Sequence, residues 1–210
     1  MFDDKTAERF AEYMEKYPEL YENLAGVVKR FVKNKNPAIV DLGVGPGLLS
    51  KAILKEIPNA NIIGIDPNKK MLNLAKQNVS SDNFKTKNGS SENIPVDDDF
   101  ADIVVSRFSL SYWKDQKKSF SEIYRVLKKD GHVILDVINK EFPAWRLFLI
   151  KIHMLLNKAG ADVTKYHVDV YKDAYTIDEV EKFITSADLS VVERQGKKKE
   201  WKFLIIAKKN

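Results

Sequence analysis

The sequence predicts an α/β fold in which helices cover a mostly parallel sheet. An apolar strand at residues 39–42 turns through three glycines, Gly43, Gly45 and Gly47, directly into a helix. A second apolar strand at residues 61–66 follows that helix, so strand and helix alternate as they do in α/β domains. Because 44% of the 210 residues are hydrophobic, the chain can form one domain with a large core.

Composition limits the chemistry of this single domain, which is expected to span residues 1–210. Cysteine is absent, which excludes disulfides, cysteine metal sites and a thiolate nucleophile, and no metal site is predicted. The net charge of +5 is spread over lysine pairs beside abundant acids, as on a solvated surface; a nucleic-acid face is the alternative. The polar N-terminus and the lack of a membrane-length apolar run predict a cytoplasmic protein without a transmembrane segment.

The glycine turn narrows the class of ligand. The dinucleotide fingerprint would need a third glycine at position 48, where Leu48 stands, and a Walker loop would need a lysine at the helix start. What remains is the pattern D-x-G-x-G-x-G beginning at Asp41, with Asp66 at the end of the second strand. A carboxylate there can accept hydrogen bonds from both ribose hydroxyls. The alternatives are structural: Asp41 could bond the turn amides, and Asp66 could cap the helix that begins near Pro67.

These motifs resemble those of class I S-adenosylmethionine (SAM)-dependent methyltransferases, in particular the methyltransferase domain of the ubiquinone and menaquinone biosynthesis type. The resemblance covers residues 38–138 and implies a Rossmann-like three-layer α/β sandwich with a seven-stranded sheet in the order 3-2-1-4-5-7-6, the last strand antiparallel. It also implies SAM as the cofactor and S-adenosylhomocysteine as the product.

By this resemblance, the glycine bend holds the methionine end of SAM and Asp66 holds the ribose. Met71 lies near the adenine, with a plain core role as the alternative. Ser90 stands where the family usually has the acid that contacts the adenine amino group, and serine can still accept a hydrogen bond. The predicted cofactor-binding residues are Asp41, Gly43, Val44, Gly45, Gly47, Asp66, Pro67, Met71, Ser90, Ser91, Arg107 and Phe108.

An N-terminal helical cover is expected over residues 1–36. Residues 3–34 have helical spacing with a break at Pro18. In methyltransferases that resemble this chain, such helices fold over the SAM pocket and help to enclose the acceptor. Their aromatic side chains are therefore candidates for the pocket wall, namely Phe10, Tyr13, Tyr17 and Tyr21. The alternative is that these side chains pack against the core.

Residues 106–113 follow the carboxyl end of a strand predicted at 103–106, where parallel sheets place ligands. This segment is expected to face the transferable methyl group. The tetrapeptide (N/D/S)-P-P-(Y/F), associated with methylation of amino nitrogens, is absent. Relatives in quinone biosynthesis often carry histidine here, whereas this chain has Ser111 and Tyr112, so no histidine base is carried over. Tyr112 is instead a catalytic candidate.

A helix at residues 115–127 and a strand at 132–138 are predicted next, followed by an insertion at 139–175. The first half of the insertion, residues 141–158, is so apolar that much of its circumference needs burial. It is expected to be a lid over the acceptor pocket that also offers a homodimer contact. Because basic residues flank its apolar face, a helix resting on membrane lipid is the alternative.

The second half of the insertion concentrates polar aromatic residues between positions 166 and 176. His167 and Tyr171 are candidates to remove a proton from the acceptor, with hydrogen-bonded structural roles as the alternative. A hairpin of two strands then closes the chain, at residues 189–194 and 201–207.

The expected function is methyl transfer from SAM to a small-molecule acceptor. Because the sulfonium is already a strong electrophile, in-line positioning and exclusion of water supply most of the catalysis, and a dedicated base is not required. Three alternatives remain: a nicotinamide-dependent oxidoreductase, against which Leu48 counts, an RNA methyltransferase, and a non-catalytic SAM-binding module.

Overall fold

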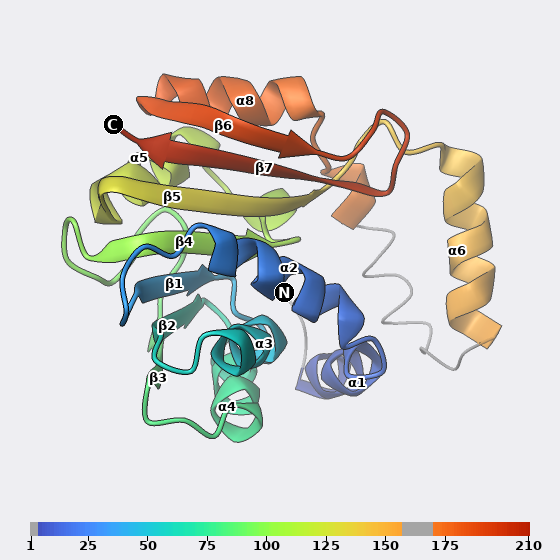
Figure 1. The fold of residues 1–210 in the computed structure, drawn as a ribbon. Coiled ribbons are helices and arrows are strands. Elements are labelled where there is room, and N and C mark those ends of the chain that lie inside the picture. Colours follow the sequence, from blue (N-terminus) through green and yellow to red (C-terminus); the bar gives the residue numbers. More distant parts are fainter. Residues whose placement is uncertain (1–3, 157–169) are drawn as a thin grey trace.

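The computed structural model describes residues 4–156 and 170–210 and contains a seven-stranded sheet (Figure 1). Its strand order, β3-β2-β1-β4-β5-β7-β6, confirms the order that the resemblance implied. Neighbours among β1 to β5 pair in parallel, whereas β7 runs antiparallel to both β5 and β6. The strands are β1 (Ala38–Leu42), β2 (Asn61–Asp66), β3 (Phe84–Asn88), β4 (Ala101–Arg107), β5 (Leu127–Ile138), β6 (Leu189–Gln195) and β7 (Lys202–Lys209).

Helices cover both faces of this sheet, which makes the fold the expected three-layer sandwich (Figure 1). One layer contains α1 (Asp4–Met14), α2 (Glu19–Arg30), α3 (Leu48–Glu56) and α4 (Lys69–Asn78). The other contains α5 (Gln116–Val126) and α8 (Ile177–Ser186). A short 3-10 helix, η1 (Leu110–Tyr112), follows β4, and α6 (Ala144–Leu156) lies at the side of the sandwich.

The two cores lie on opposite sides of the same strands. Along β1, Ile39 packs in the apolar cluster beneath α2 and α3, and its neighbour Val40 packs in the cluster beneath α5 and α8. Both side chains are fully buried, and each such burial is worth about 1.5–3 kcal/mol. With both faces covered, the carboxyl edge of the parallel strands is the part of the sheet left for a ligand.

The N-terminal helices break at Pro18, as the sequence predicts. Pro18 occupies the N-cap position of α2, where its missing N–H costs no helical hydrogen bond. Helix α1 packs on α4, and α2 packs on α3. Tyr13 and Tyr21 are buried in the core cluster of this layer, so packing accounts for much of their environment.

Strand β5 begins earlier than the sequence predicts. It starts at Leu127, directly after α5, so the residues between the predicted helix at 115–127 and the predicted strand at 132–138 lie within its first part. Leu127 pairs with Ala101 before a register irregularity, and Asp130 adopts a positive φ of 62°. The pairing with β4 therefore begins at Leu127, shifts register, and resumes at His132, so the strand extends on both sides of the irregularity.

Of the predicted segment 141–158, the structure describes α6, whereas His167 lies outside the described residues. Among the helices of the described part of the chain, none combines the length and the apolar character needed to cross a membrane.

Candidate cofactor and acceptor site

The backbone N–H groups of the glycine bend after β1 form hydrogen bonds within the protein. The N–H groups of Gly43 and Val44 donate to the carbonyl of Ile65 at 2.8 and 3.0 Å, and that of Gly47 donates to the carbonyl of Val44 at 3.0 Å. The Gly45 N–H donates to Asp66 Oδ2 at 3.1 Å. These amides are directed at protein oxygens rather than outward, which agrees with the argument against a phosphate cradle.

Asp66 lies across from this bend at the end of β2. Its Oδ1 accepts from the N–H of Asn68 at 2.8 Å. The structural alternative for Asp66 is wrong in its detail, because the N-cap of α4 is Asn68, whose side chain accepts from the N–H groups of Lys70 and Met71. Burial raises the pKa of Asp66, and the two backbone hydrogen bonds, from Asn68 and Gly45, oppose that rise. Each carboxylate oxygen has two acceptor sites, so both can still accept from a ribose hydroxyl.

Open space lies next to the middle glycine of the bend. A Cβ built on Gly45 would have no atom within 4 Å, although the φ of 51° is unfavourable for a side chain. By contrast, a Cβ on Gly47 would lie 3.0 Å from Ala75 of α4. The bend thus has room for a ligand beside Gly45, within reach of the Asp66 carboxylate, and these residues fit a nucleoside that carries a ribose.

Asp41 lies beneath the bend and is 1% exposed. The hydroxyl of Ser50, in α3, donates to Asp41 Oδ2 at 2.6 Å. Burial raises the pKa of Asp41 to about 7, and the nearby charge of Asp66 adds to the rise, against the hydrogen bond from Ser50. One contact of Asp41 is therefore structural, since it ties the strand to the helix after the bend, and its predicted link to the ligand stays a prediction.

The residues predicted near the adenine have mixed exposure. Met71 is buried in the first turn of α4, whereas Pro67 is exposed. Ser91 is buried and its hydroxyl accepts from the hydroxyl of Ser119 at 2.9 Å, so it contacts α5. Ser90 is half-buried in the same loop and pairs through its backbone with Asn93. Ser90 is thus the more available of the two serines, and adenine contacts remain a prediction for both.

A cluster of charges joins the carboxyl ends of β4 and β5 to the start of β7. The sequence predicts one member, Arg107, as a cofactor-binding residue, but the sequence reasoning missed the other two, Asp136 and Lys202. Arg107, at the end of β4, forms an ion pair with Asp136 of β5, and Lys202 Nζ of β7 lies 2.9 Å from Asp136 Oδ2. The Asp136 side chain is fully buried, and its Oδ1 has no hydrogen-bond partner. A charged residue inside the apolar strand at residues 132–138 was the signal that could have indicated it.

The ring of Phe108 lies close to both cations of this cluster. The Arg107 guanidinium is 4.3 Å from the centre of its ring, and Lys202 Nζ is 6.0 Å from it. Phe108 has a positive φ of 53°, which is uncommon for an aromatic residue, and its N–H donates to the carbonyl of Asp136 at 2.8 Å. Arg107 also lies 5.0 Å from the ring of Tyr21, so α2 contacts the cluster as well.

Three aromatic rings adjoin the cluster. Phe142 and Trp201 meet edge to face at 5.2 Å, and Tyr171 stacks on Trp201 at 6.5 Å. The Tyr171 hydroxyl lies 2.6 Å from the carbonyl oxygen of Phe142, which supports the structural alternative for this catalytic candidate. Tyr112, the other candidate in the described part of the chain, is 46% exposed. Both catalytic roles stay predictions.

The sequence of residues 40–135 matches the family described as "Methyltransferase domain". The chain is 34% identical over 182 residues to the demethylmenaquinone methyltransferase of Lactobacillus johnsonii, covering 81% of this chain and 70% of the relative. It is 30% identical over 144 residues to the chloroplastic 2-methyl-6-phytyl-1,4-hydroquinone methyltransferase of Spinacia oleracea, covering 68% of this chain but only 41% of that protein.

A solved structure of a SAM-dependent methyltransferase from Aquifex aeolicus has the same fold. It superposes with a TM-score of 0.73 at 19% identity and covers 99% of both chains. That the glycine bend and Asp66 hold SAM stays a prediction. The methyltransferase domain matches residues 40–135, and the Lactobacillus relative is 34% identical and is matched over 70% of its length. This chain therefore belongs to the SAM-dependent methyltransferases, with SAM as methyl donor.

Proposed function

We propose that the acceptor is the ring of a hydroquinone, a small molecule whose two hydroxyl groups activate a neighbouring ring carbon. The observation that carries the proposal is the pair of cations, Arg107 and Lys202, held on the buried Asp136 beside the Phe108 ring. Such a site suits an aromatic acceptor that becomes negatively charged. The names of two relatives, a demethylmenaquinone and a phytyl-hydroquinone methyltransferase, support this class of acceptor.

The cofactor side follows from the geometry of the bend. Asp66 would accept from the ribose hydroxyls, and the space beside Gly45 would receive the methionine end. When bound, SAM supplies a methyl group on a positively charged sulfur and is released as S-adenosylhomocysteine. The loop that contains Ser90 is the proposed neighbour of the adenine.

On the acceptor side, Lys202 has the most direct role in this proposal. Its side chain is 39% exposed, so its ammonium group is accessible while Asp136 holds it in place. A cation beside a phenolic hydroxyl lowers the pKa of that hydroxyl and stabilises the oxyanion. With SAM bound, the oxyanion would donate electrons to the adjacent ring carbon, which would bond to the methyl carbon as the methyl–sulfur bond breaks and its electron pair goes to sulfur. The ring carbon would then release its own proton to solvent.

The aromatic residues exclude water and orient the ring. Phe108 lies next to the two cations, and Trp201, which packs on the buried Phe142, directly precedes Lys202. An acceptor ring can therefore pack flat or edge-on against the partly exposed rings of Phe108 and Trp201. Orientation of this kind contributes up to about 7–11 kcal/mol when the reacting atoms are held in line. Helices α1, α2 and α6 are the proposed cover of the site.

The test is an acceptor competition with the purified full chain. Radiolabelled SAM is offered together with a chemically reduced 2-prenyl-1,4-naphthoquinone, a benzohydroquinone with an apolar tail, or total tRNA. Label in an organic-extractable quinol supports the proposal. Label in tRNA alone would establish the RNA methyltransferase alternative, and tight S-adenosylhomocysteine binding without label in any acceptor would favour a SAM-binding module.

A further inference from the structure

Helix α6 carries an exposed apolar stripe. Five of its large apolar side chains are between 39% and 77% exposed, and they recur at the spacing of one helical face: Trp145, Phe148, Leu149, Ile152 and Leu156. Single exposed apolar residues are ordinary on protein surfaces, but a contiguous stripe of this length indicates a surface that binds something.

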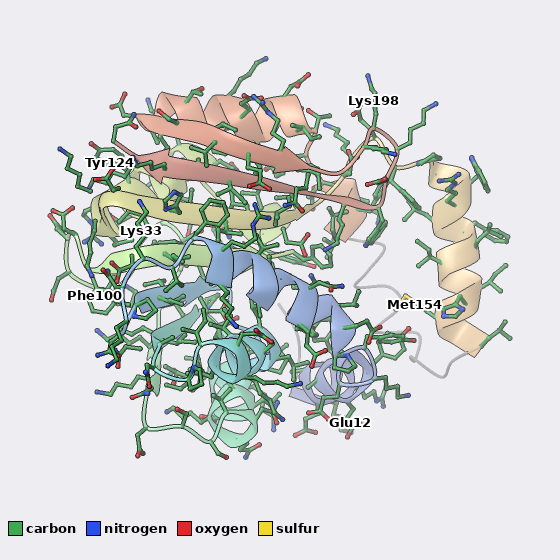
Figure 2. All side chains as sticks on the ribbon, in the orientation of Figure 1. Glu12, Lys33, Phe100, Tyr124, Met154 and Lys198 are labelled. Carbon is green, nitrogen blue, oxygen red and sulfur yellow. The ribbon has the colours of Figure 1, made fainter. Side chains whose placement is uncertain are left out.

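The opposite face of α6 is already used by the fold. Met154 is only 4% exposed and belongs to the core cluster of the α1–α4 layer, and Ile150 packs against the same cluster. Figure 2 shows Met154 on the side of α6 that faces the rest of the molecule. Because the inner face holds the helix on the body, the outer stripe is not required for the core and is available for a partner.

Charge indicates what kind of partner fits. Residues 144–156 include Arg146 and Lys151 but no aspartate or glutamate. Around the helix, Arg146 lies about 100° from Trp145 in one direction and Lys151 about 120° in the other, so the stripe has a basic residue along each edge. Both side chains are exposed, and the Arg146 guanidinium lies 5.1 Å from the Trp145 ring.

We infer that the outer face of α6 binds the surface of an anionic phospholipid bilayer. The apolar stripe would enter the boundary between headgroups and acyl chains while Arg146 and Lys151 reach lipid phosphates. A second copy of this chain is a poorer fit, since a two-fold contact through the stripe would bring like charges of both helices together. A tryptophan with a neighbouring arginine is also suited to the membrane interface, where one end is apolar and the other is wet.

This surface is continuous with the acceptor side. Phe142, which packs on Trp201 in the aromatic cluster, lies only two residues before the first residue of α6. Docking of α6 would therefore bring the acceptor side close to the bilayer, where hydroquinones with apolar tails dissolve. That benefit rests on the proposed function, whereas the binding itself does not.

The experiment measures co-sedimentation of the full chain with vesicles. Vesicles of phosphatidylcholine alone are compared with vesicles that contain a quarter phosphatidylglycerol, at low and high salt. We expect binding only to the anionic vesicles, weakened by salt. The double variant Trp145→Ser/Phe148→Ser should bind at least tenfold more weakly, and Arg146→Gln/Lys151→Gln should lose about fivefold per charge removed.

Matched controls separate this surface from general effects. Val192→Thr changes an exposed apolar residue of β6, and Lys33→Gln/Lys129→Gln removes two exposed positive charges elsewhere; Figure 2 shows Lys33 on the side of the view opposite α6. These variants should bind as the parent does. Equal vesicle binding by all variants would overturn the inference. It would also be overturned if the parent does not bind vesicles and is a dimer that Trp145→Ser/Phe148→Ser converts to a monomer. Because no turnover is measured, failure here is distinct from failure of the proposed acceptor.

Discussion

Ser109 occupies the space that a side chain at Gly43 would need. A Cβ built on Gly43 would lie 2.5 Å from Ser109 Cβ and 2.9 Å from its hydroxyl oxygen. The Ser109 hydroxyl also lies 3.3 Å from the carbonyl oxygen of Leu42 and 3.0 Å from Trp113 Nε1. The loop after β4 is thus packed onto the first glycine of the bend, whereas the space beside Gly45 is open.

Gly43→Ala should be strongly destabilising. A side chain there would have to adopt a φ of 79° and would lie 2.5 Å from Ser109 Cβ, which is bonded to the backbone and cannot move away on its own. Together these two effects cost about 2–4 kcal/mol. Urea unfolding measures the loss. The control is Gly26→Ala in α2, where a Cβ meets nothing within 4 Å and a gain of about 0.5–1 kcal/mol is expected. Equal stabilities for the two variants would contradict this account.

Gly45→Ala should instead weaken the binding of the cofactor. The new methyl group enters space that the protein leaves empty, so the free energy of unfolding should fall only by about 1–2 kcal/mol, the strain of its φ. Calorimetry should show at least tenfold weaker binding of S-adenosylhomocysteine. Unchanged affinity would mean that the ligand does not approach the bend at this point.

Asp66→Ala should weaken S-adenosylhomocysteine binding by roughly ten- to a hundredfold or more. Hydrogen bonds from ribose hydroxyls to a carboxylate are each worth about 1.5–3 kcal/mol, and the alanine removes their acceptor. Because Asp66 also accepts from Gly45 and Asn68, thermal unfolding must show that the variant is folded at the temperature of measurement. Asp97→Ala, at an exposed turn, is the control, and parental affinity in Asp66→Ala would refute the ribose role.

Asp41 should make the protein less stable as the pH rises. Its pKa is about 7 in the folded chain against an ordinary value of 3.8, so the folded state holds the proton more tightly than the unfolded state. The free energy of unfolding therefore declines between about pH 4 and pH 7, and this group contributes at most roughly 4 kcal/mol to the decline. Above about pH 7 its contribution is constant.

The variant Asp41→Asn removes that dependence while keeping an oxygen to accept from Ser50. Relative to the parent, it should be more stable at pH 8 than at pH 5, as measured by melting temperatures at both values. Gly26→Ala, which changes no titratable group, should show no such difference between the two pH values. The same relative stability of Asp41→Asn at both pH values would disprove the effect.

Lys202→Met should lower kcat by about tenfold to a hundredfold, with a smaller change in KM. The loss of the ammonium group removes stabilisation of the acceptor oxyanion, so the defect should shrink as the pH rises and the hydroxyl ionises unaided. Lys202→Arg should recover most of the activity. Lys208→Met is a matched control on β7, since Lys208 pairs with Asp130 at the other end of the strand. A defect that is independent of pH would indicate a merely structural role.

The sequence by itself determined the alternation of strands and helices, the glycine bend and the carboxylate at the end of the second strand. These features are local: apolar runs, three glycines and Asp66 all lie within one stretch, and their spacing is set by the strand, turn and helix that contain them. The closing hairpin is local in the same sense, because two strands joined by a short turn pair with each other.

Only the tertiary structure decided which side chains meet at the acceptor side. Arg107 and Asp136 lie opposite each other because β4 and β5 pair in that register, and Lys202 reaches them because β7 inserts between β5 and β6. Ser109 contacts the position of Gly43 for the same reason. Helix α6 has one buried and one exposed apolar face because only one of its sides packs against the rest of the protein. Such contacts depend on register and packing between distant segments, and no spacing within one segment encodes them.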